Sequence, residues 1–186
     1  MKEMELPDAC PHQLSFLLDN FVRRAIHDPK RIFSKYVKPG HVVLDVGCGP
    51  GTFAMDLAKM VGDGGRVIAA DLQQGMLDKL SAKLEGSGMG KRVMLVKATE
   101  DSLNVQENVD FAVAFYMAHE VPDQERLFRE IHSLLKPDGV FLLVEPVIHV
   151  SRGAFDAEVL MAEKSGLKPL TRDSIPLSQA VAFKRG

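Results

Sequence analysis

The sequence predicts an α/β protein with a doubly wound, seven-stranded, mostly parallel sheet. Three observations predict it. β-Branched runs alternate with helical periodicity from residue 41 onward. A turn with three glycines, at residues 47–51, joins a strand to a helix. The last two strands are joined by the five residues 174–178, so they are expected to pair as an antiparallel hairpin, because a parallel crossover needs a dozen residues or more.

The composition is that of an ordinary folded domain. The 186 residues are 46% hydrophobic and 26% charged, which is typical of one globular domain, expected here over residues 1–186. The net charge of -2 does not favour nucleic acid or an anionic membrane as a partner. Two cysteines, Cys10 and Cys48, are too few for a disulfide scaffold. No signal peptide or membrane span is recognised, so the expected location is the cytoplasm.

The first half of the core contains three strands and two helices. A β-branched strand is expected at 41–46, a helix at 51–61 and a second strand at 66–72. The run 62–65, Gly-Asp-Gly-Gly, separates that helix from the second strand. A second helix at 74–85, with leucines and a methionine at helical spacing, leads to a third strand at 92–98.

The second half repeats this alternation and ends in the hairpin. The run 136–139, Lys-Pro-Asp-Gly, is read as a helix stop and turn. The remaining expected elements are strand 109–115, helix 123–135, strand 140–145, helix 154–165 and the hairpin strands 167–172 and 179–184.

A helical N-terminal preface, residues 1–37, is expected before the core at 38–186. Its apolar positions between residues 14 and 26 form an amphipathic stripe over the stretch 11–37. The stripe either packs on the sheet or forms a lid over a ligand cleft, and the sequence favours neither.

The glycine turn is the most informative segment. Gly47, Gly49 and Gly51 follow a buried strand and precede a helix, with Cys48 as a small residue between the first two. Glycine permits positive φ and close approach of a ligand to the backbone. The helix that follows directs unpaired N–H groups toward that ligand.

Two residues distinguish this turn from a dinucleotide site. Dinucleotide sites follow G-x-G-x-x-G, but Thr52 occupies the sixth position here. Asp45 precedes the first glycine by two residues, and a carboxylate there would repel a pyrophosphate but attract an ammonium group. A nicotinamide-dependent oxidoreductase is therefore the least favoured alternative.

The D-x-G-x-G-x-G loop resembles motif I of the class I S-adenosylmethionine-dependent methyltransferases, in the branch that includes the ubiquinone- and menaquinone-biosynthesis enzymes. The resemblance extends from Tyr36 through the last strand. It implies a Rossmann-like methyltransferase fold, S-adenosylmethionine as cofactor, S-adenosylhomocysteine as product and a small-molecule methyl acceptor. Two alternatives remain: an ordinary strand-to-helix turn, and a non-catalytic module that binds the same nucleoside.

Asp71 supports the nucleoside interpretation. It ends the second strand, 20 residues after Gly51, where a carboxylate can accept hydrogen bonds from both ribose hydroxyls. Its alternative role is to cap the helix that follows. The resemblance adds Leu72 and Met76 as residues that pack against adenine.

The adenine amino group lacks its usual partner. Many relatives carry an aspartate where Ala98 stands, so backbone groups near Thr99 or the side chain of Glu100 are expected to substitute for it. After the fourth strand, the resemblance places the backbone of Phe115 and Tyr116 along the cofactor and substrate.

The chemistry is expected beyond strands four and five. Methyl transfer often needs a base, and His119 is the candidate for that role or for orienting the acceptor, with Glu145 and His149 assisting. The alternatives are helix capping by His119 and an exposed loop position for His149. Together with His12 and Glu120 these residues have the ligand types of a divalent metal, but they lack a recognisable spacing, so no metal is expected. The sequence leaves the acceptor atom undetermined and a homodimer through the apolar preface open.

Overall fold

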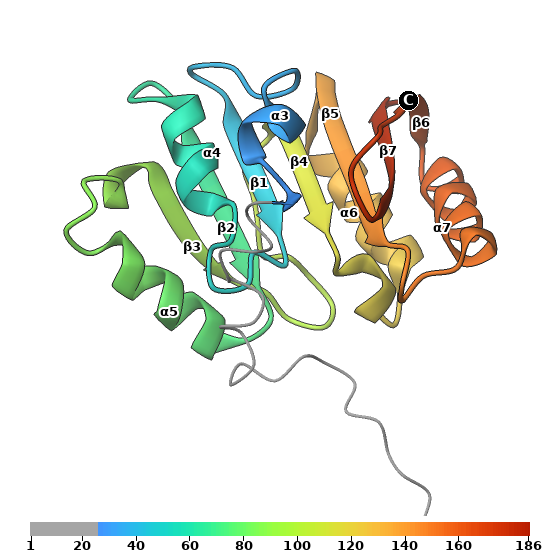
Figure 1. Ribbon diagram of the computed structural model, residues 1–186, viewed down its shortest axis with the longest axis horizontal. Helices are drawn as coiled ribbons and strands as arrows, with labels where there is room; N and C mark the ends of the chain where they lie inside the picture. Colours follow the sequence, from blue (N-terminus) through green and yellow to red (C-terminus); the bar gives the residue numbers. More distant parts are fainter. Residues whose placement is uncertain (1–25) are drawn as a thin grey trace, which may run out of the picture.

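The computed structural model describes residues 26–186, which contain a seven-stranded sheet flanked by helices (Figure 1). The strand order is β3-β2-β1-β4-β5-β7-β6, and all pairs are parallel except β5 with β7 and β6 with β7. This arrangement confirms the predicted fold class. The strands are β1 (Val42–Val46), β2 (Arg66–Asp71), β3 (Val93–Lys97), β4 (Val109–Phe115), β5 (Leu135–Pro146), β6 (Leu167–Arg172) and β7 (Ser178–Arg185).

Helices cover both faces of the sheet, and each face has its own core. The helices α3 (Pro29–Phe33), α4 (Ala54–Val61) and α5 (Gln74–Leu84) bury their apolar sides on one face, whereas α6 (Gln124–Leu134) and α7 (Arg152–Lys164) cover the other. The central strand β1 is buried along its whole length, with Val43 facing the first core and Leu44 the second. Burial on both faces explains why its sequence is a continuous apolar run with one exception, Asp45.

The first helix of the core begins later than predicted. The sequence suggested residue 51, but α4 begins at Ala54. Gly47, Gly49 and Gly51 all have positive φ, so the chain turns through residues 47–53 before helical geometry is established. The segment between β1 and α4 is therefore a longer loop than the sequence pattern indicated.

The predicted turn at 136–139 is replaced by a bulge inside β5. Leu135 pairs with Val109, and the ladder resumes where Val140 pairs with Phe111, with a register shift between them. Strand β5 therefore begins directly after α6 and five residues earlier than predicted. The Lys-Pro-Asp-Gly run leaves the ladder locally, because proline has no N–H to donate and the bulge accommodates it. The predicted antiparallel hairpin of β6 and β7 is confirmed.

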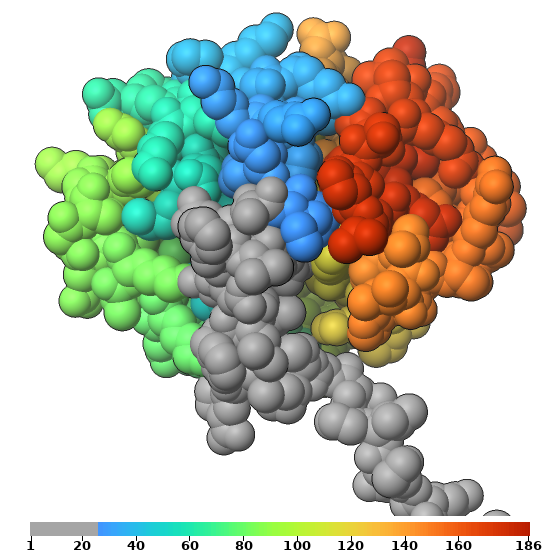
Figure 2. All heavy atoms as spheres, viewed as in Figure 1, coloured from blue at the N-terminus to red at the C-terminus, as the bar shows by residue number. Residues whose placement is uncertain are grey.

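The described part of the preface packs beside the C-terminal hairpin. The hydroxyl of Tyr36 donates a hydrogen bond to the Asp173 carboxylate at 2.7 Å, and the Tyr36 ring stacks on Phe111. In the space-filling view the blue segment from α3 onward adjoins the red C-terminal segment (Figure 2). The predicted amphipathic stripe, together with Cys10 and His12, lies outside residues 26–186. A single domain over 1–186 stays a prediction.

Among residues 26–186, no helix has the length and apolar character needed to cross a bilayer.

Candidate active site

A cleft of about 1070 Å³ opens at the carboxyl ends of the central strands. The strand order reverses between β1 and β4, because the chain passes from β1 to β2 and β3 on one side and returns to β4 on the other. Open parallel sheets bind ligands at such a switch point. The cleft is lined by residues from the ends of β1, β2, β4 and β5 and from the loops that follow them. Of the predicted site residues, all border this cleft except Gly51 and Glu145.

The three glycines of the loop have different structural roles. A Cβ on Gly51 would lie 2.4 Å from Cδ1 of Leu80, so this glycine permits packing between the loop and α5. A Cβ on Gly47 would lie 2.8 Å from Cγ of Met117. A Cβ on Gly49 would have no neighbour within 4 Å. Gly49 is therefore the position where the backbone is open to a ligand, whereas Gly51 belongs to the core.

Asp71 holds the glycine loop in place. Its Oδ2 accepts a hydrogen bond from the backbone N–H of Gly49 at 2.8 Å, and its Oδ1 accepts one from Gln73 at 2.7 Å. The second bond resembles the capping role considered from the sequence, although Gln73 is the N-cap residue of α5. A carboxylate oxygen has two lone pairs, so each oxygen can accept one further hydrogen bond on the cleft side.

Asp45 is the most unusual group in the cleft. It is 3% exposed, and its Oδ2 has no hydrogen-bond partner among the described residues. Burial, reinforced by the nearby charge of Asp71, raises the pKa of Asp45 to about 7. Burial also raises the pKa of Asp71. A buried carboxyl whose ionisation is disfavoured by burial and by a neighbouring carboxyl creates a site where a cation would be stabilised.

The end of the cleft beyond β2 and β3 is apolar with a polar margin. Leu72 is 46% exposed at the cleft, and Met76 is buried beside it. The Thr99 N–H donates to the Ser102 carbonyl at 2.8 Å, so this backbone donor is engaged within its own segment. The exposed side chain of Glu100 remains next to Ala98 as a polar group on this side.

Tyr116 has a strained backbone at the end of β4. Its φ is +61°, which is unusual for a residue with a side chain. Its N–H donates to the Val144 carbonyl at 2.8 Å, and its hydroxyl lies 2.6 Å from Ser178 Oγ and 3.1 Å from His27 Nε2. Bonds to β5, β7 and the segment before α3 therefore fix this strained residue at the edge of the cleft.

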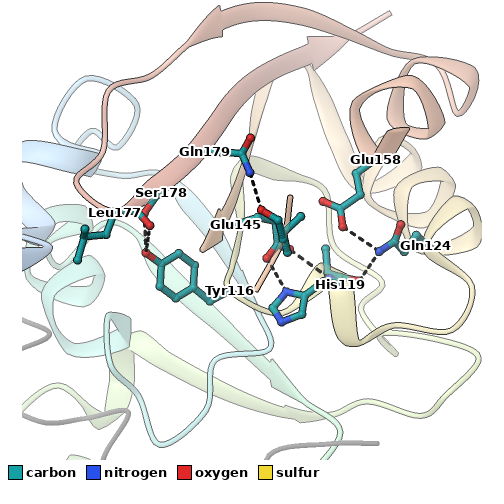
Figure 3. A network of polar contacts seen from close by, with 10 residues as sticks. Tyr116, His119, Gln124, Glu145, Glu158, Leu177, Ser178 and Gln179 are labelled. Carbon is teal, nitrogen blue, oxygen red and sulfur yellow. Dashed lines mark hydrogen bonds and ion pairs between the residues drawn. The ribbon is translucent and has the colours of Figure 1, made fainter. Parts of the chain in front are cut away.

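His119, beyond the end of β4, and Glu145, near the end of β5, form a hydrogen-bonded pair (Figure 3). Glu145 is fully buried, and its Oε2 accepts from His119 Nδ1 at 2.5 Å while its Oε1 accepts from the His119 backbone N–H at 3.2 Å. The bond to Glu145 raises the pKa of His119. Since Nδ1 is directed to Glu145, Nε2 is the ring nitrogen available to a reactant, and Glu145 lies behind the histidine instead of lining the cleft.

A second buried carboxyl, not predicted from the sequence, lies near this pair. Glu158 on α7 is 4% exposed and accepts from Gln124 Nε2 at 3.1 Å, and the same nitrogen donates to the Ala118 carbonyl at 2.9 Å (Figure 3). The signal was present in the sequence. Glu158 shares the buried side of α7 with apolar Phe155 and Val159, three residues before it and one after.

The alternative of a metal site is not supported by the described residues. His149 is exposed on the rim, and its ring centroid lies 6.2 Å from that of His119. Within residues 26–186, no three side chains of the His, Cys, Asp or Glu types are grouped so that they could hold an ion.

Comparisons with known proteins identify relatives of the chain. A family model described as "Methyltransferase domain" matches residues 43–139. The demethylmenaquinone methyltransferase of Lactobacillus johnsonii is 34% identical over 62% of this chain and 48% of its own length. The ubiquinone/menaquinone biosynthesis C-methyltransferase UbiE of Enterobacter sp. is 34% identical over 65% of this chain and 50% of its own. The chain therefore spans about half the length of these curated relatives.

Solved structures agree with the sequence comparisons. A SAM-dependent methyltransferase from Aquifex aeolicus has a TM-score of 0.85 at 25% identity, covering 96% of this chain and 100% of that one. A TehB-like SAM-dependent methyltransferase from Corynebacterium glutamicum has a TM-score of 0.72 over 95% of this chain and 100% of its own, and at 19% identity it shows the fold alone. The resemblance inferred from the glycine loop, with the fold and cofactor class it implied, is confirmed.

Proposed function

The chain belongs to the methyltransferase domain family, and we propose that it transfers a methyl group from S-adenosylmethionine to a small, uncharged acceptor. The observation that carries the proposal is the buried Asp45 carboxyl with its unpartnered Oδ2, at the floor of the cleft beside the open Gly49. S-Adenosylmethionine carries an ammonium group and a sulfonium, and it supplies an activated methyl when bound.

Asp45 and Asp71 fit this cofactor in complementary ways. Asp45 would bind the ammonium group, because a cation beside the buried carboxyl supplies the partner that Oδ2 lacks. Asp71 would accept the ribose hydroxyls with the lone pairs that Gly49 and Gln73 leave unused. Leu72 and Met76 would contact the adenine, and Glu100 would accept from its amino group.

His119 is proposed as the base. With Nδ1–H donated to Glu145, the neutral imidazole presents Nε2 to the cleft, where it can take the proton of an acceptor hydroxyl. The buried Glu145 carboxylate then stabilises the imidazolium that forms. His149, on the rim, would contact the acceptor. This arrangement favours an enzyme over a module that only binds the nucleoside.

The charges of the cleft indicate which acceptors fit. Its lining contains the carboxyls of Asp45, Asp71, Glu100, Glu120 and Glu130, against the single guanidinium of Arg126. Phosphorylated acceptors and nucleic acid would be repelled by this lining, because like charges destabilise a complex. A neutral acceptor with an ionisable hydroxyl is favoured.

The rim indicates an apolar acceptor. Val147 is 47% exposed, Ile148 is 82% exposed and Leu177 is 62% exposed, and the Val147 N–H donates to the Leu177 carbonyl at 3.2 Å, so these side chains belong to adjacent segments. Exposed apolar groups beside a cleft often mark a ligand site. The relatives named as demethylmenaquinone and UbiE methyltransferases support a quinol-type ring as the acceptor.

Calorimetry and methyl-transfer assays test this function. We expect S-adenosylhomocysteine to bind and NAD not to bind. Radiolabelled S-adenosylmethionine should label a hydroquinone or catechol in a panel that also contains phosphorylated phenols and RNA. Binding of NAD without binding of S-adenosylhomocysteine would refute the cofactor assignment, and labelling of the anionic acceptors alone would refute the acceptor class.

A further inference from the structure

The short 3-10 helix that carries His119, η3 (Ala118–Glu120), is held from two directions by buried carboxyls. From β5, Glu145 accepts from both the backbone and the ring of His119. From α7, Glu158 holds Gln124, which donates to the Ala118 carbonyl, one residue before the histidine. Figure 3 shows both connections converging on this turn.

Glu158 is a costly choice for packing alone. It is 4% exposed on a helix side otherwise occupied by Phe155, Val159 and Ala162. Its Oε2 has no hydrogen-bond partner among the described residues. An apolar residue of similar size would avoid the desolvation of a carboxyl. Its electrostatic environment contains two ionisable groups, Glu145 from β5 and His119 from η3, and the uncharged Gln124 from α6.

We propose that Glu158 is a positioning residue for His119, acting through Gln124 on the turn and through its own charge on the imidazole. This inference rests on the proposed role of His119 as base. The carboxylate of Glu158 attracts the imidazolium, and the Gln124 bridge prevents the turn from moving away from Glu145. Glu158 does not touch the cleft, since it is absent from its lining, so its influence on the reaction is indirect.

Three carboxyls, those of Glu145, Glu120 and Glu158, raise the pKa of His119, so its protonation depends on their charge. Burial, together with the charge of Glu145, raises the pKa of Glu158 to about 7, whereas Gln124 and His119 favour its ionised form. Glu158 therefore gains its charge as the pH rises through about 7. Ionisation of Glu158 favours the protonated histidine, so the two titrations are coupled.

The test is the pKa of His119, measured by NMR titration of its ring protons in the full chain. Glu158→Gln keeps the shape and removes the charge, and Glu163→Gln makes the same change at an exposed site on the same helix. The histidine signal is assigned by its loss in His119→Asn. We expect Glu158→Gln to lower the pKa of His119 by about half a unit, about a threefold change in its protonation equilibrium. Glu163→Gln should leave it unchanged.

A His119 pKa in Glu158→Gln equal to that in Glu163→Gln would overturn the proposal. Gln124→Ala is a second variant, which removes the bridge while every carboxyl is kept. We expect it to change the chemical shift of the His119 backbone amide. An unchanged amide shift would overturn the bridging role. Affinity for S-adenosylhomocysteine, measured on the same samples, should equal that of the parent chain. If the parent chain itself does not bind S-adenosylhomocysteine, the proposed function is refuted. The histidine titration would still decide the role of Glu158.

Discussion

Binding of S-adenosylhomocysteine should depend on pH through Asp45. With a pKa of about 7, this carboxyl is largely protonated at pH 6 and largely ionised at pH 7.5. If the ligand's ammonium requires the ionised form, the ionised fraction predicts an affinity ~8-fold weaker at pH 6 than at pH 7.5. Binding strength is thus present above the raised pKa and is lost as the pH falls through it.

The assay is isothermal titration calorimetry at the two pH values and constant ionic strength. Asp45→Asn should bind weakly at both, because the amide cannot ionise. Asp78→Asn, on the exposed side of α5, is the matched control and should keep the parent's pH dependence. An Asp45→Asn variant with the parent's affinity and pH profile would refute the assignment of the ammonium to this residue.

Asp45 should also reduce stability in the free protein. An acid whose pKa is raised from 3.8 to about 7 binds its proton more tightly when folded. The contribution of Asp45 to stability is therefore most favourable at low pH and falls as the pH rises between these values, by up to ~4 kcal/mol for a shift of about three units. Asp45→Asn should unfold at higher denaturant concentration than the parent chain at pH 7.5, and this difference should vanish near pH 4. Equal midpoints at pH 7.5 would contradict the raised pKa.

Four further substitutions separate packing, binding and chemistry. Gly51→Ala should lower the free energy of unfolding by ~2 kcal/mol or more, because its Cβ would overlap Leu80 and its φ is +83°. Gly49→Ala has no such overlap, so its loss of S-adenosylhomocysteine affinity should exceed its effect on denaturant stability. His119→Asn should reduce single-turnover methyl transfer ~100-fold or more with unchanged S-adenosylhomocysteine affinity. Glu145→Gln should move the acid limb of the rate profile to lower pH, because Glu145 raises the pKa of His119 and only the neutral histidine is a base. An unmoved limb would separate His119 from the chemistry.

The sequence located most strands because their signals are local. The β-branched runs of β1 and β4, each buried on both faces, and the short link before β7 are sufficient to place these strands. The start of β5 was missed for a tertiary reason. Leu135 joins the sheet by pairing with Val109, and only that pairing distinguishes a bulge from a turn at 136–139.

The sequence predicted that Asp45, Gly49 and Asp71 would lie at one cleft, and all three line it. The motif did not distinguish Gly49, which faces open space, from Gly51, which faces Leu80, because that difference depends on where α5 packs. The placement of Glu145 behind His119, and the bridge from Glu158, depend on the relative positions of β5, α6 and α7 and are not local.

The loop thiol has a consequence for a chain that is proposed to bind an electrophile. Cys48 lies between two glycines of the loop, 4% exposed. Burial, strengthened by the charges of Asp45 and Asp71, raises its pKa well above the usual value. Only a thiolate attacks an alkyl donor at an appreciable rate. The carboxyls proposed to attract the methyl donor thus also help to keep the neighbouring sulfur protonated, which would protect the chain from alkylation by that donor.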